Sequence, residues 1–257
     1  DLNDTLLNNR QNLFMILFRE ETNSVNSKSA LVLFSGGQDS TVCLAWALSQ
    51  YEYVETIGFT YGQRHKVELG QRPIVREKLI EMKFFSSQLG PDTLLDLSSY
   101  RGWSHTALTD EKDISTETSG LPNTFVPGRN LIFLTYAAIE AYRRQIINLV
   151  GGMCEVDYSG YPDCRNETIK ALGLAVSLGF ATPIKIQTPL MFLNKMKIWD
   201  MAFQLGGSPL IDLIIEYSHT CYLGDRTQRH NWGYGCGRCP ACALRAKGYE
   251  QWNETQS

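Results

Sequence analysis

The residues best suited to chemistry form a short glycine-containing loop, SGGQDST, at residues 35–41. The apolar run 31–34 before it predicts a buried strand, and the apolar-rich run 42–48 after it predicts a helix. First-turn N–H groups of a helix lack intrahelical partners, the helix dipole is positive there, and glycine lets a backbone approach a phosphate closely. We therefore predict a phosphate-binding loop, with an ordinary strand-to-helix turn as the alternative.

The side chains of this loop extend the prediction. Ser35, Ser40 and Thr41 supply hydroxyl donors, while Asp39 can either cap the helix or hold a magnesium ion. The chain contains no GxxxxGKS or GxxxxGKT string and no GxGxxG string, which argues against a Walker-type nucleotidase and a dinucleotide fold. A loop without the Walker lysine suits enzymes that cut ATP between its α- and β-phosphates.

A second chemical signal is a group of cysteines near the C-terminus. Three of them follow each other at x-x spacing and one lies upstream: Cys221, Cys236, Cys239 and Cys242. Four thiolates fill a tetrahedral shell, so we predict one structural Zn²⁺, with a redox disulfide or unrelated buried thiols as alternatives. Cys221 is the least certain of the four ligands, because His219 and His230 are nearby.

Composition limits the class of protein. The formal charge is −3, so no global field favours nucleic acid or an anionic membrane. No run of eighteen apolar residues occurs, so we expect no membrane span. Seven cysteines, clustered as described, suit a metal site in a reducing compartment better than a disulfide framework, and predict a cytoplasmic location.

Strand and helix patterns alternate along the chain. We expect strands at 31–34, 53–60, 146–150 and 184–187, and helices from the loop to about residue 50 and at 65–83, 131–144, 166–178 and 194–205. Residues 86–128 show no lasting periodicity, which predicts a functional loop or lid. The pattern predicts an α/β fold with a mostly parallel sheet, helices on both faces, and ligands beyond the carboxyl ends of the strands. We divide the chain into an N-terminal extension of unknown role (1–29), the nucleotide domain (30–210) and a zinc-binding region packed on it (211–257).

Six strings in the chain resemble those of the 7-cyano-7-deazaguanine synthase family, which forms the nitrile of the queuosine precursor. They are FSGGQDST (34–41), YGQRH (61–65), PNTFVPGRN (122–130), DYSGYPDCR (157–165), TPLMFLNK (188–195) and CGRCPACALRAKG (236–248). They occur in the order of that family and span nearly all of residues 31–248. The resemblance implies a PP-loop ATP pyrophosphatase with an adenine nucleotide alpha hydrolase-like fold.

The resemblance also implies a reaction with two activations. The carboxylate of 7-carboxy-7-deazaguanine attacks the α-phosphate of ATP, which is bound with Mg²⁺, and ammonia then displaces AMP to give the amide. A second ATP adenylates the amide oxygen, and loss of AMP leaves the nitrile. The expected partners are these small molecules and a second copy of the chain in a homodimer, with no membrane and no direct nucleic acid contact.

Several residues are assigned on this resemblance. The catalytic residues are Asp39, Lys195, Arg129 and Arg165, the cations being placed to offset charge on phosphate oxygens. The ATP-binding residues are Phe34, Ser35, Gly36, Gly37, Gln38, Asp39, Ser40, Thr41, Val42, Cys43 and Leu44, of which the last three support the helix. The residues expected to contact the substrate are Arg64, His65, Asp157, Tyr158, Tyr161 and Asp163, although each has a purely structural alternative.

Two other functions remain open. A related ATP pyrophosphatase could act on another nucleobase or acyl substrate, including tRNA thiolation or conjugation of a deazaguanine to a protein. Thiolation usually needs a reactive cysteine near the nucleotide loop, and Cys43 is expected on the helix. A zinc-dependent nucleic-acid-binding module is permitted by basic residues around the cysteines, which are better explained as a solvated rim: Arg226, Arg229, Arg238, Arg245 and Lys247.

Overall fold

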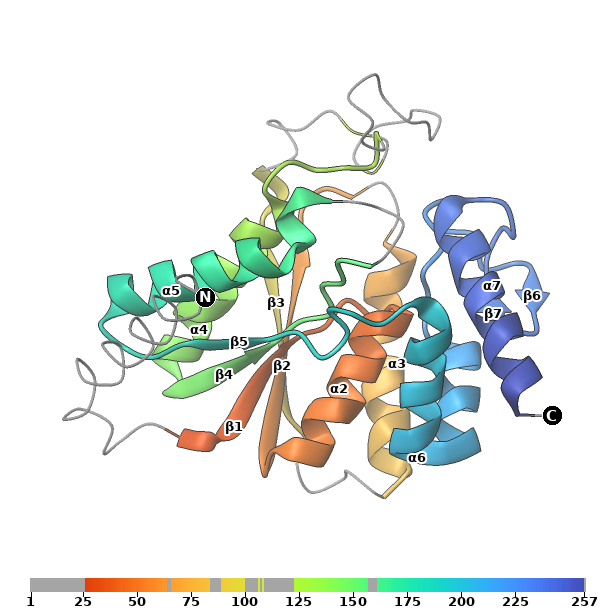
Figure 1. Cartoon of the computed structure of the whole chain (residues 1–257), viewed down its shortest axis with the longest axis horizontal. Coiled ribbons are helices and arrows are strands. Elements are labelled where there is room, and N and C mark those ends of the chain that lie inside the picture. Colours follow the sequence, from red (N-terminus) through yellow and green to blue (C-terminus); the bar gives the residue numbers. More distant parts are fainter. Residues whose placement is uncertain are drawn as a thin grey trace, which may run out of the picture.

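Five parallel strands form the central sheet of the computed structural model, which describes residues 26–63, 66–83, 89–99, 106, 108, 123–156 and 161–256 (Figure 1). The strands are β1 (Asn26–Leu33), β2 (Tyr53–Thr60), β3 (Leu89–Asp96), β4 (Ile146–Val150) and β5 (Lys185–Gln187). Their order in the sheet is β3-β2-β1-β4-β5, and every pairing is parallel. The predicted α/β class with a mostly parallel sheet is therefore confirmed.

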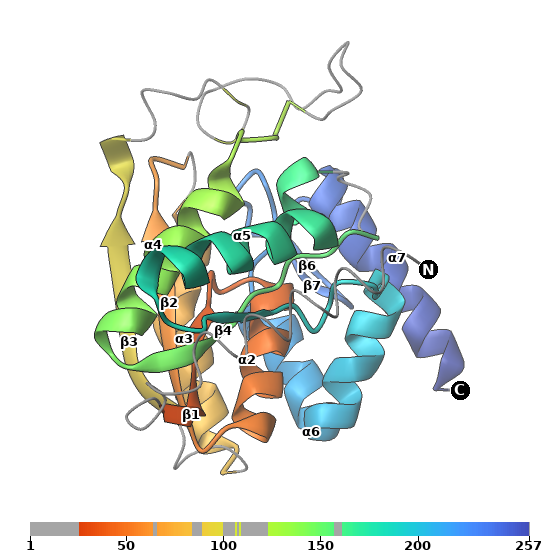
Figure 2. The same cartoon turned by 60° about the vertical axis from the view of Figure 1, so that its left-hand side comes forward.

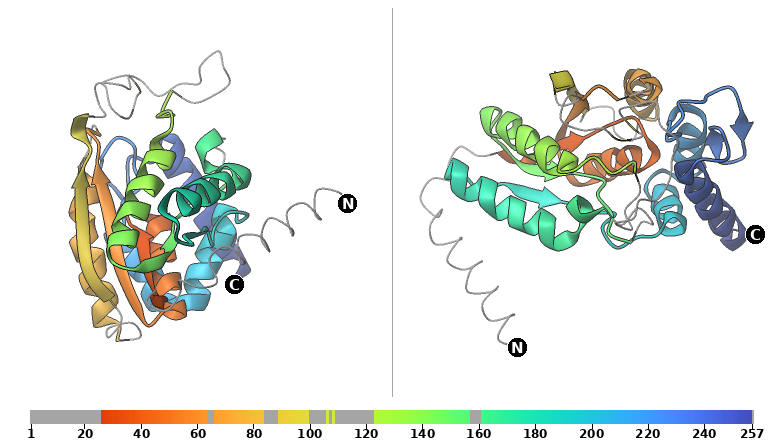
Figure 3. Two further views of the ribbon diagram at one scale, coloured as in Figure 1. Left: turned by 90° about the vertical axis from the view of Figure 1, so that its left-hand side faces the viewer. Right: turned by 90° about the horizontal axis from the view of Figure 1, so that it is seen from above.

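Helices cover both faces of this sheet. On one face lie α2 (Gln38–Gln50), α3 (Val67–Glu81) and α6 (Lys195–Tyr217), and α7 (Pro240–Thr255) packs on α6. On the other face lie α4 (Arg129–Arg143) and α5 (Asn166–Phe180), as the turned views show (Figures 2 and 3). A strand buried on both faces is expected to be apolar throughout, which is why 31–34 is a continuous apolar run.

Residues of β1 alternate between the two hydrophobic cores. Ala30 and Val32 pack with α2, α3 and α6, whereas Leu31 and Leu33 pack with α4 and α5. The chain leaves β1 for β2 and β3 on one side, then crosses to β4 on the other side of β1. Ligands of such sheets bind where the strand order switches, beyond the carboxyl ends. The glycine-containing loop, which follows β1, lies at that position.

Two predictions about secondary structure are wrong in part. Residues 89–96, expected to be irregular, form the edge strand β3, although Gly90, Pro91 and Asp92 are weak strand formers. The strand is held by its ladder with β2 and by α3, from which Arg72 pairs with Asp92 and Arg76 donates to the carbonyl of Gly90. These contacts come from tertiary structure, and no local pattern in the sequence predicts them.

The second difference concerns α6, which was expected to end near residue 205. It continues to Tyr217 with a kink at Gly207, where φ is 61° and ψ is −159°. A short hairpin, β6 (Arg229–His230) and β7 (Gly233–Tyr234), then leads to α7. The boundary at residue 210 stays a prediction. Within the extension 1–29, residues 26–29 begin β1 and the others lie outside the described residues.

Candidate nucleotide site and metal centre

The glycine pair after β1 lets α3 lie directly against the loop. Gly36 has a φ of +97°, a conformation that favours glycine, and a Cβ there would lie 2.5 Å from the carbonyl oxygen of Glu68. A Cβ on Gly37 would lie 2.7 Å from a carboxylate oxygen of Glu68. The glycines are therefore required by the approach of the first turn of α3.

The hydroxyl of Ser40 holds the loop in shape. Its Oγ accepts from the amides of Ser35 and Gly36, each at 3.2 Å, and donates to the carbonyl oxygen of Gly37 at 3.0 Å. Thr41 donates its hydroxyl to the same carbonyl at 2.8 Å. The turn is thus closed over the N-terminus of α2 by side chains of the first helical turn, and its backbone geometry is set before any ligand arrives.

A lysine from the far part of the chain meets the loop. Lys195 begins α6, whose N-terminus is capped by the side chain of Asn194 accepting from the amide of Lys197 at 3.0 Å. The Nζ of Lys195 lies 2.6 Å from Oδ2 of Asp39, and the lysine side chain is buried. The helix cap residue is Gly37, without a side-chain cap, so Asp39 binds the lysine instead of capping α2. Two predicted catalytic residues, 156 positions apart, are in direct contact.

A cavity of about 350 Å³ opens beside this pair, at the carboxyl ends of β1, β2 and β4. The predicted site residues that line it are Phe34, Ser35, Asp39, Ser40, Arg129 and Tyr161. Val42, Cys43 and Leu44 are fully buried in the core under the loop. Burial, followed by the charge of Asp39, raises the pKa of Cys43, so this thiol stays protonated and unreactive.

Other predicted residues lie elsewhere. Arg165 is exposed at the N-cap of α5 and is absent from the described lining of the cavity. Gln38 is buried, and its side-chain amide has no hydrogen-bond partner among the described residues. Arg64, His65, Asp157 and Tyr158 lie outside the described residues, so their roles stay predictions, as does the lid at 86–128 beyond β3.

Arg129 places a permanent positive charge in the cavity wall. Burial alone lowers the pKa of this guanidinium, but Tyr61, Tyr161 and Asp163 outweigh burial, so the pKa is raised. The guanidinium carbon lies 6.0 Å from the ring centre of Tyr61. An arginine held in this way can offset negative charge that develops on a bound phosphate.

The segment of Tyr161 and Asp163 has a structural function. One oxygen of Asp163 accepts from the amide of Asn130 at 2.9 Å, which places a carboxylate at the N-terminus of α4. The hydroxyl of Tyr161 lies 2.6 Å from that of Thr124. Tyr161 also faces the cavity, whereas Asp163 is buried behind it, and its other oxygen has no partner among the described residues.

Several lining residues of the cavity were not predicted, and three of them lie directly against the glycine loop. Glu68 lines the cavity from α3, and His219 and Thr220 line it from the segment after α6. The amide of His219 donates to the carbonyl of Gly36 at 3.1 Å, and Thr220 Oγ1 accepts from the amide of Gln38 at 3.5 Å. The only signals in the sequence were position: Glu68 follows the string YGQRH, and His219 and Thr220 directly precede Cys221.

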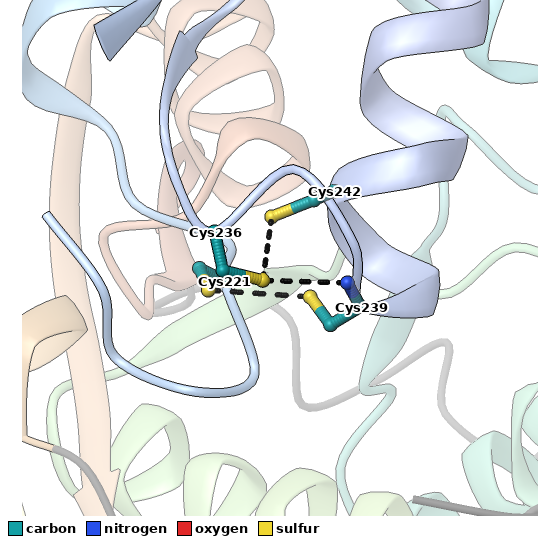
Figure 4. A group of neighbouring side chains, drawn as sticks. All are labelled: Cys221, Cys236, Cys239 and Cys242. Atoms are coloured by element: carbon teal, nitrogen blue, oxygen red, sulfur yellow. Dashed lines mark hydrogen bonds between the residues drawn. The ribbon is translucent and has the colours of Figure 1, made fainter. Parts of the chain in front are cut away.

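The four predicted cysteines meet in one cluster (Figure 4). Their sulfur atoms lie within 4.8 Å of one another, and the Cys236–Cys242 and Cys221–Cys239 pairs are each 4.0 Å apart. A tetrahedral zinc with sulfurs at about 2.3 Å needs sulfurs about 3.8 Å apart. The cluster can therefore hold a metal ion, and the sulfurs need only contract slightly around it.

Local geometry explains how the chain closes around these sulfurs. Gly237 has a φ of +70° between the first two cysteines of the C-terminal group, and a Cβ on Gly235 would lie 2.6 Å from the sulfur of Cys242. The amide of Cys239 donates to the sulfur of Cys236 at 3.3 Å. His230 stacks on Trp232 and bonds to the carbonyl of Gly235, so it is committed elsewhere.

One basic residue near the cysteines corrects the expectation of a solvated rim. Arg245 is buried and donates to the carbonyls of Trp232 and Ile214, at 2.9 Å each, and to Thr220 Oγ1 at 3.0 Å. Burial lowers its pKa to about 10, opposed by the charge of Asp39. This arginine cannot contact nucleic acid. It ties the C-terminal helix to the wall of the cavity.

A larger cavity, about 670 Å³, lies between α3, α6 and the segment of β6. None of the predicted site residues that the structure describes lines it, and its described walls carry no phosphate loop or cysteine cluster. No described helix is long and apolar enough to cross a membrane.

A parallel sheet with a glycine loop and a buried lysine–aspartate pair at its switch point defines a nucleotide-binding α/β protein, here joined to a cluster of four cysteines that could hold a metal ion. A family model described as "Queuosine biosynthesis protein QueC" matches residues 29–253, and the chain belongs to this family. The resemblance inferred from the six strings is therefore confirmed.

Curated relatives share this sequence over most of their length. A protein of Bordetella pertussis named 7-cyano-7-deazaguanine synthase is 58% identical over 228 residues, covering 88% of this chain and 93% of the relative. One of the same name from Leptothrix cholodnii is 60% identical over 228 residues, covering 88% and 97%. Among solved structures, a crystal structure of a 4-thiouridine synthetase–RNA complex with bound ATP has 16% identity and a TM-score of 0.46, covering 89% of this chain and 51% of that chain. Structural similarity at that level is not evidence of a shared function.

Proposed function

We propose that this chain converts 7-carboxy-7-deazaguanine and ammonia to 7-cyano-7-deazaguanine, using two molecules of ATP by way of an adenylated acid and an adenylated amide. The observation that carries the proposal is the membership of the chain in the QueC family. Relatives named 7-cyano-7-deazaguanine synthase are 58–60% identical to the chain along nearly their whole length. Contact between Asp39 and Lys195 at the glycine loop supports it, because adenylation needs positive charge beside a phosphate site.

In this proposal the loop 35–41 binds the triphosphate. Amides at the N-terminus of α2 and the hydroxyl of Ser35 are proposed to bind the pyrophosphate that leaves, while Ser40 keeps the loop in shape. Mg²⁺ accompanies ATP as part of the substrate. Lys195 and Arg129 offset the charge on the phosphate oxygens. Arg165 is exposed and lies outside the described lining of the cavity, so its catalytic role has no support from the geometry.

The deazaguanine ring is proposed to lie in the remainder of the cavity. Phe133 stacks on Phe59 with ring centres 4.4 Å apart, and Tyr161 faces the same space, so an aromatic wall is present for a planar ring. Asp157, Tyr158, Arg64 and His65 are proposed to complete the contacts. Carboxylates suit the amino and ring N–H donors of a guanine-like edge.

We assign a structural Zn²⁺ to Cys221, Cys236, Cys239 and Cys242. Their four sulfurs fill a tetrahedral shell, so the metal supplies stability and offers no open position to substrate. A homodimer is part of the same proposal. No direct contact with nucleic acid is proposed, since three small substrates require no basic surface. Gel filtration with light scattering, with and without added RNA, tests both points.

The decisive assay incubates the protein with the carboxy acid, ammonium and Mg-ATP. We expect the cyano product, with two AMP formed for each nitrile. Other nucleobase acids and a thiolation assay run in parallel, and Asp39→Asn serves as the variant that should lose turnover. Formation of no AMP with the carboxy acid, or faster turnover of another acid, contradicts the proposed function.

A further inference from the structure

The proposed reaction needs a proton acceptor, and no described residue has been given that role so far. A carboxylate attacking the α-phosphate of ATP releases no proton. Ammonia displacing AMP from the acyl adenylate forms a C–N bond, breaks a C–O bond and releases one proton. Conversion of the amide to the nitrile releases both remaining N–H protons, as the amide oxygen leaves on AMP. An acceptor is therefore required only in the steps at nitrogen.

The described cavity offers few groups that can take a proton. Asp39 is paired with Lys195 at 2.6 Å. His219 lines the cavity, but both of its ring nitrogens are buried from solvent, without a hydrogen-bond partner among the described residues. Cys154 donates its thiol to the carbonyl of Leu193 at 3.2 Å. Glu68 is the lining carboxylate that remains.

Glu68 borders the region where the reacting carbon of the substrate is expected to lie. Its carboxylate approaches Gly37 so closely that a Cβ there would be 2.7 Å away, so it stands at the end of the phosphate loop. Arg129, from α4, lines the same cavity, and its positive charge acts on the Glu68 carboxylate. An acyl carbon joined to the α-phosphate has to lie between the loop and the rest of the cavity, which is the region that Glu68 borders.

The electrostatic setting suits an acceptor. Burial raises the pKa of Glu68, while a hydrogen bond with Ser35 and the charges of Arg129 and Arg72 lower it, and Asp39 raises it. Burial prevails, so the carboxylate binds a proton more strongly than an ordinary surface glutamate. Brønsted behaviour makes such a group a better general base near neutral pH.

Resting on the proposed function, we propose that Glu68 is the general base for both steps at nitrogen, accepting the proton lost when ammonia is acylated and the protons lost as the amide becomes a nitrile. It takes no part in the first adenylation. Each accepted proton then passes to solvent, which restores the carboxylate for the next step.

The test separates adenylation from nitrogen chemistry. Acid-dependent exchange of pyrophosphate into ATP reports the first step, amide formation reports the second, and nitrile formation from synthetic amide reports the third. We expect Glu68→Gln to keep the exchange rate close to wild type and to slow amide and nitrile formation by about 10²-fold or more. Glu68→Asp should recover part of the lost rate.

The matched control is Glu81→Gln, which removes an exposed carboxylate of the same helix that pairs with Lys78 at 2.7 Å. All three rates should be unchanged in it. Equal loss of exchange and of amide formation in Glu68→Gln would place this residue at the nucleotide, and unchanged amide and nitrile formation would remove it from the reaction. Either result overturns the inference. Absence of acid-dependent exchange in the wild type would instead overturn the proposed function.

Discussion

A methyl group added at Gly248 should damage the site through Lys195. Gly248 lies in α7 against the start of α6, and a Cβ there would be 2.4 Å from Lys195 Cβ, 2.8 Å from its carbonyl carbon and 3.1 Å from the amide of Met196. These atoms belong to the main chain or sit directly on it, so none of them can swing aside. Gly179, in α5, has nothing within 4 Å of the same position and is exposed.

We therefore expect the same substitution, glycine to alanine, to change the free energy of unfolding in opposite directions at these two positions. Alanine gains up to about 1 kcal/mol over glycine in a helix. Overpacking costs about 1–3 kcal/mol, and contact with backbone favours the upper part of that range. Gly248→Ala should lower the free energy of unfolding by about 1–2 kcal/mol, whereas Gly179→Ala should raise it by about 0.5–1 kcal/mol.

Urea unfolding of both variants measures these values, and turnover measured in the same samples reports the position of the lysine. Because α6 must shift to accept the new methyl group, Lys195 moves relative to Asp39, and Gly248→Ala should lose turnover while Gly179→Ala keeps it. If Gly248→Ala were as stable and as active as the wild type, the close approach of α7 to α6 would not exist as described.

Three further predictions concern charge and metal. Lys195→Met should destabilise the fold by about 2–4 kcal/mol, and adding Asp39→Asn should recover part of that loss in a double-mutant cycle; strictly additive effects would show that the pair is not in contact. Cys239→Ser should lose the metal measured by elemental analysis and lower the unfolding midpoint; unchanged metal content would rule out this cluster as the binding site. Since the folded pKa of Glu68 is raised, its contribution to stability is present at low pH and is lost as the pH rises through that pKa. Glu68→Gln should therefore gain stability over wild type at pH 8 and none near pH 4, and a constant difference would contradict the raised pKa.

Most of the sheet could be predicted from the sequence, because strands buried on both faces are apolar throughout. Residues 53–60 and 146–150 were predicted with the bounds that the structure shows. The edge strand at 89–96 was missed for the opposite reason. It has one partner strand, exposes Leu94, and contains Gly90 and Pro91, so its pattern is that of a loop. Only the ladder with β2 makes it a strand.

The site was predictable where its chemistry is contiguous. The loop 35–41 and the C-terminal cysteines are short strings with fixed spacing, so each could be recognised without any knowledge of the fold. Glu68, His219 and Arg245 depend on which segments meet in space. Arg245 illustrates the limit: among neighbouring basic residues it was indistinguishable in the sequence, yet it is the buried one, because three oxygen acceptors surround it.

The four-cysteine cluster and the nucleotide loop are joined by one short segment, 218–222. The amide of His219 donates to the carbonyl of Gly36, and Thr220 Oγ1 accepts from the amide of Gln38 and from the side chain of Arg245. The next residue, Cys221, belongs to the cluster. A shell of four sulfurs has no open position for a substrate. The proposed metal would then influence catalysis by fixing the segment that holds the loop. The cysteine cluster is thus part of the scaffold of the nucleotide site, although none of the proposed chemical steps occurs at the metal.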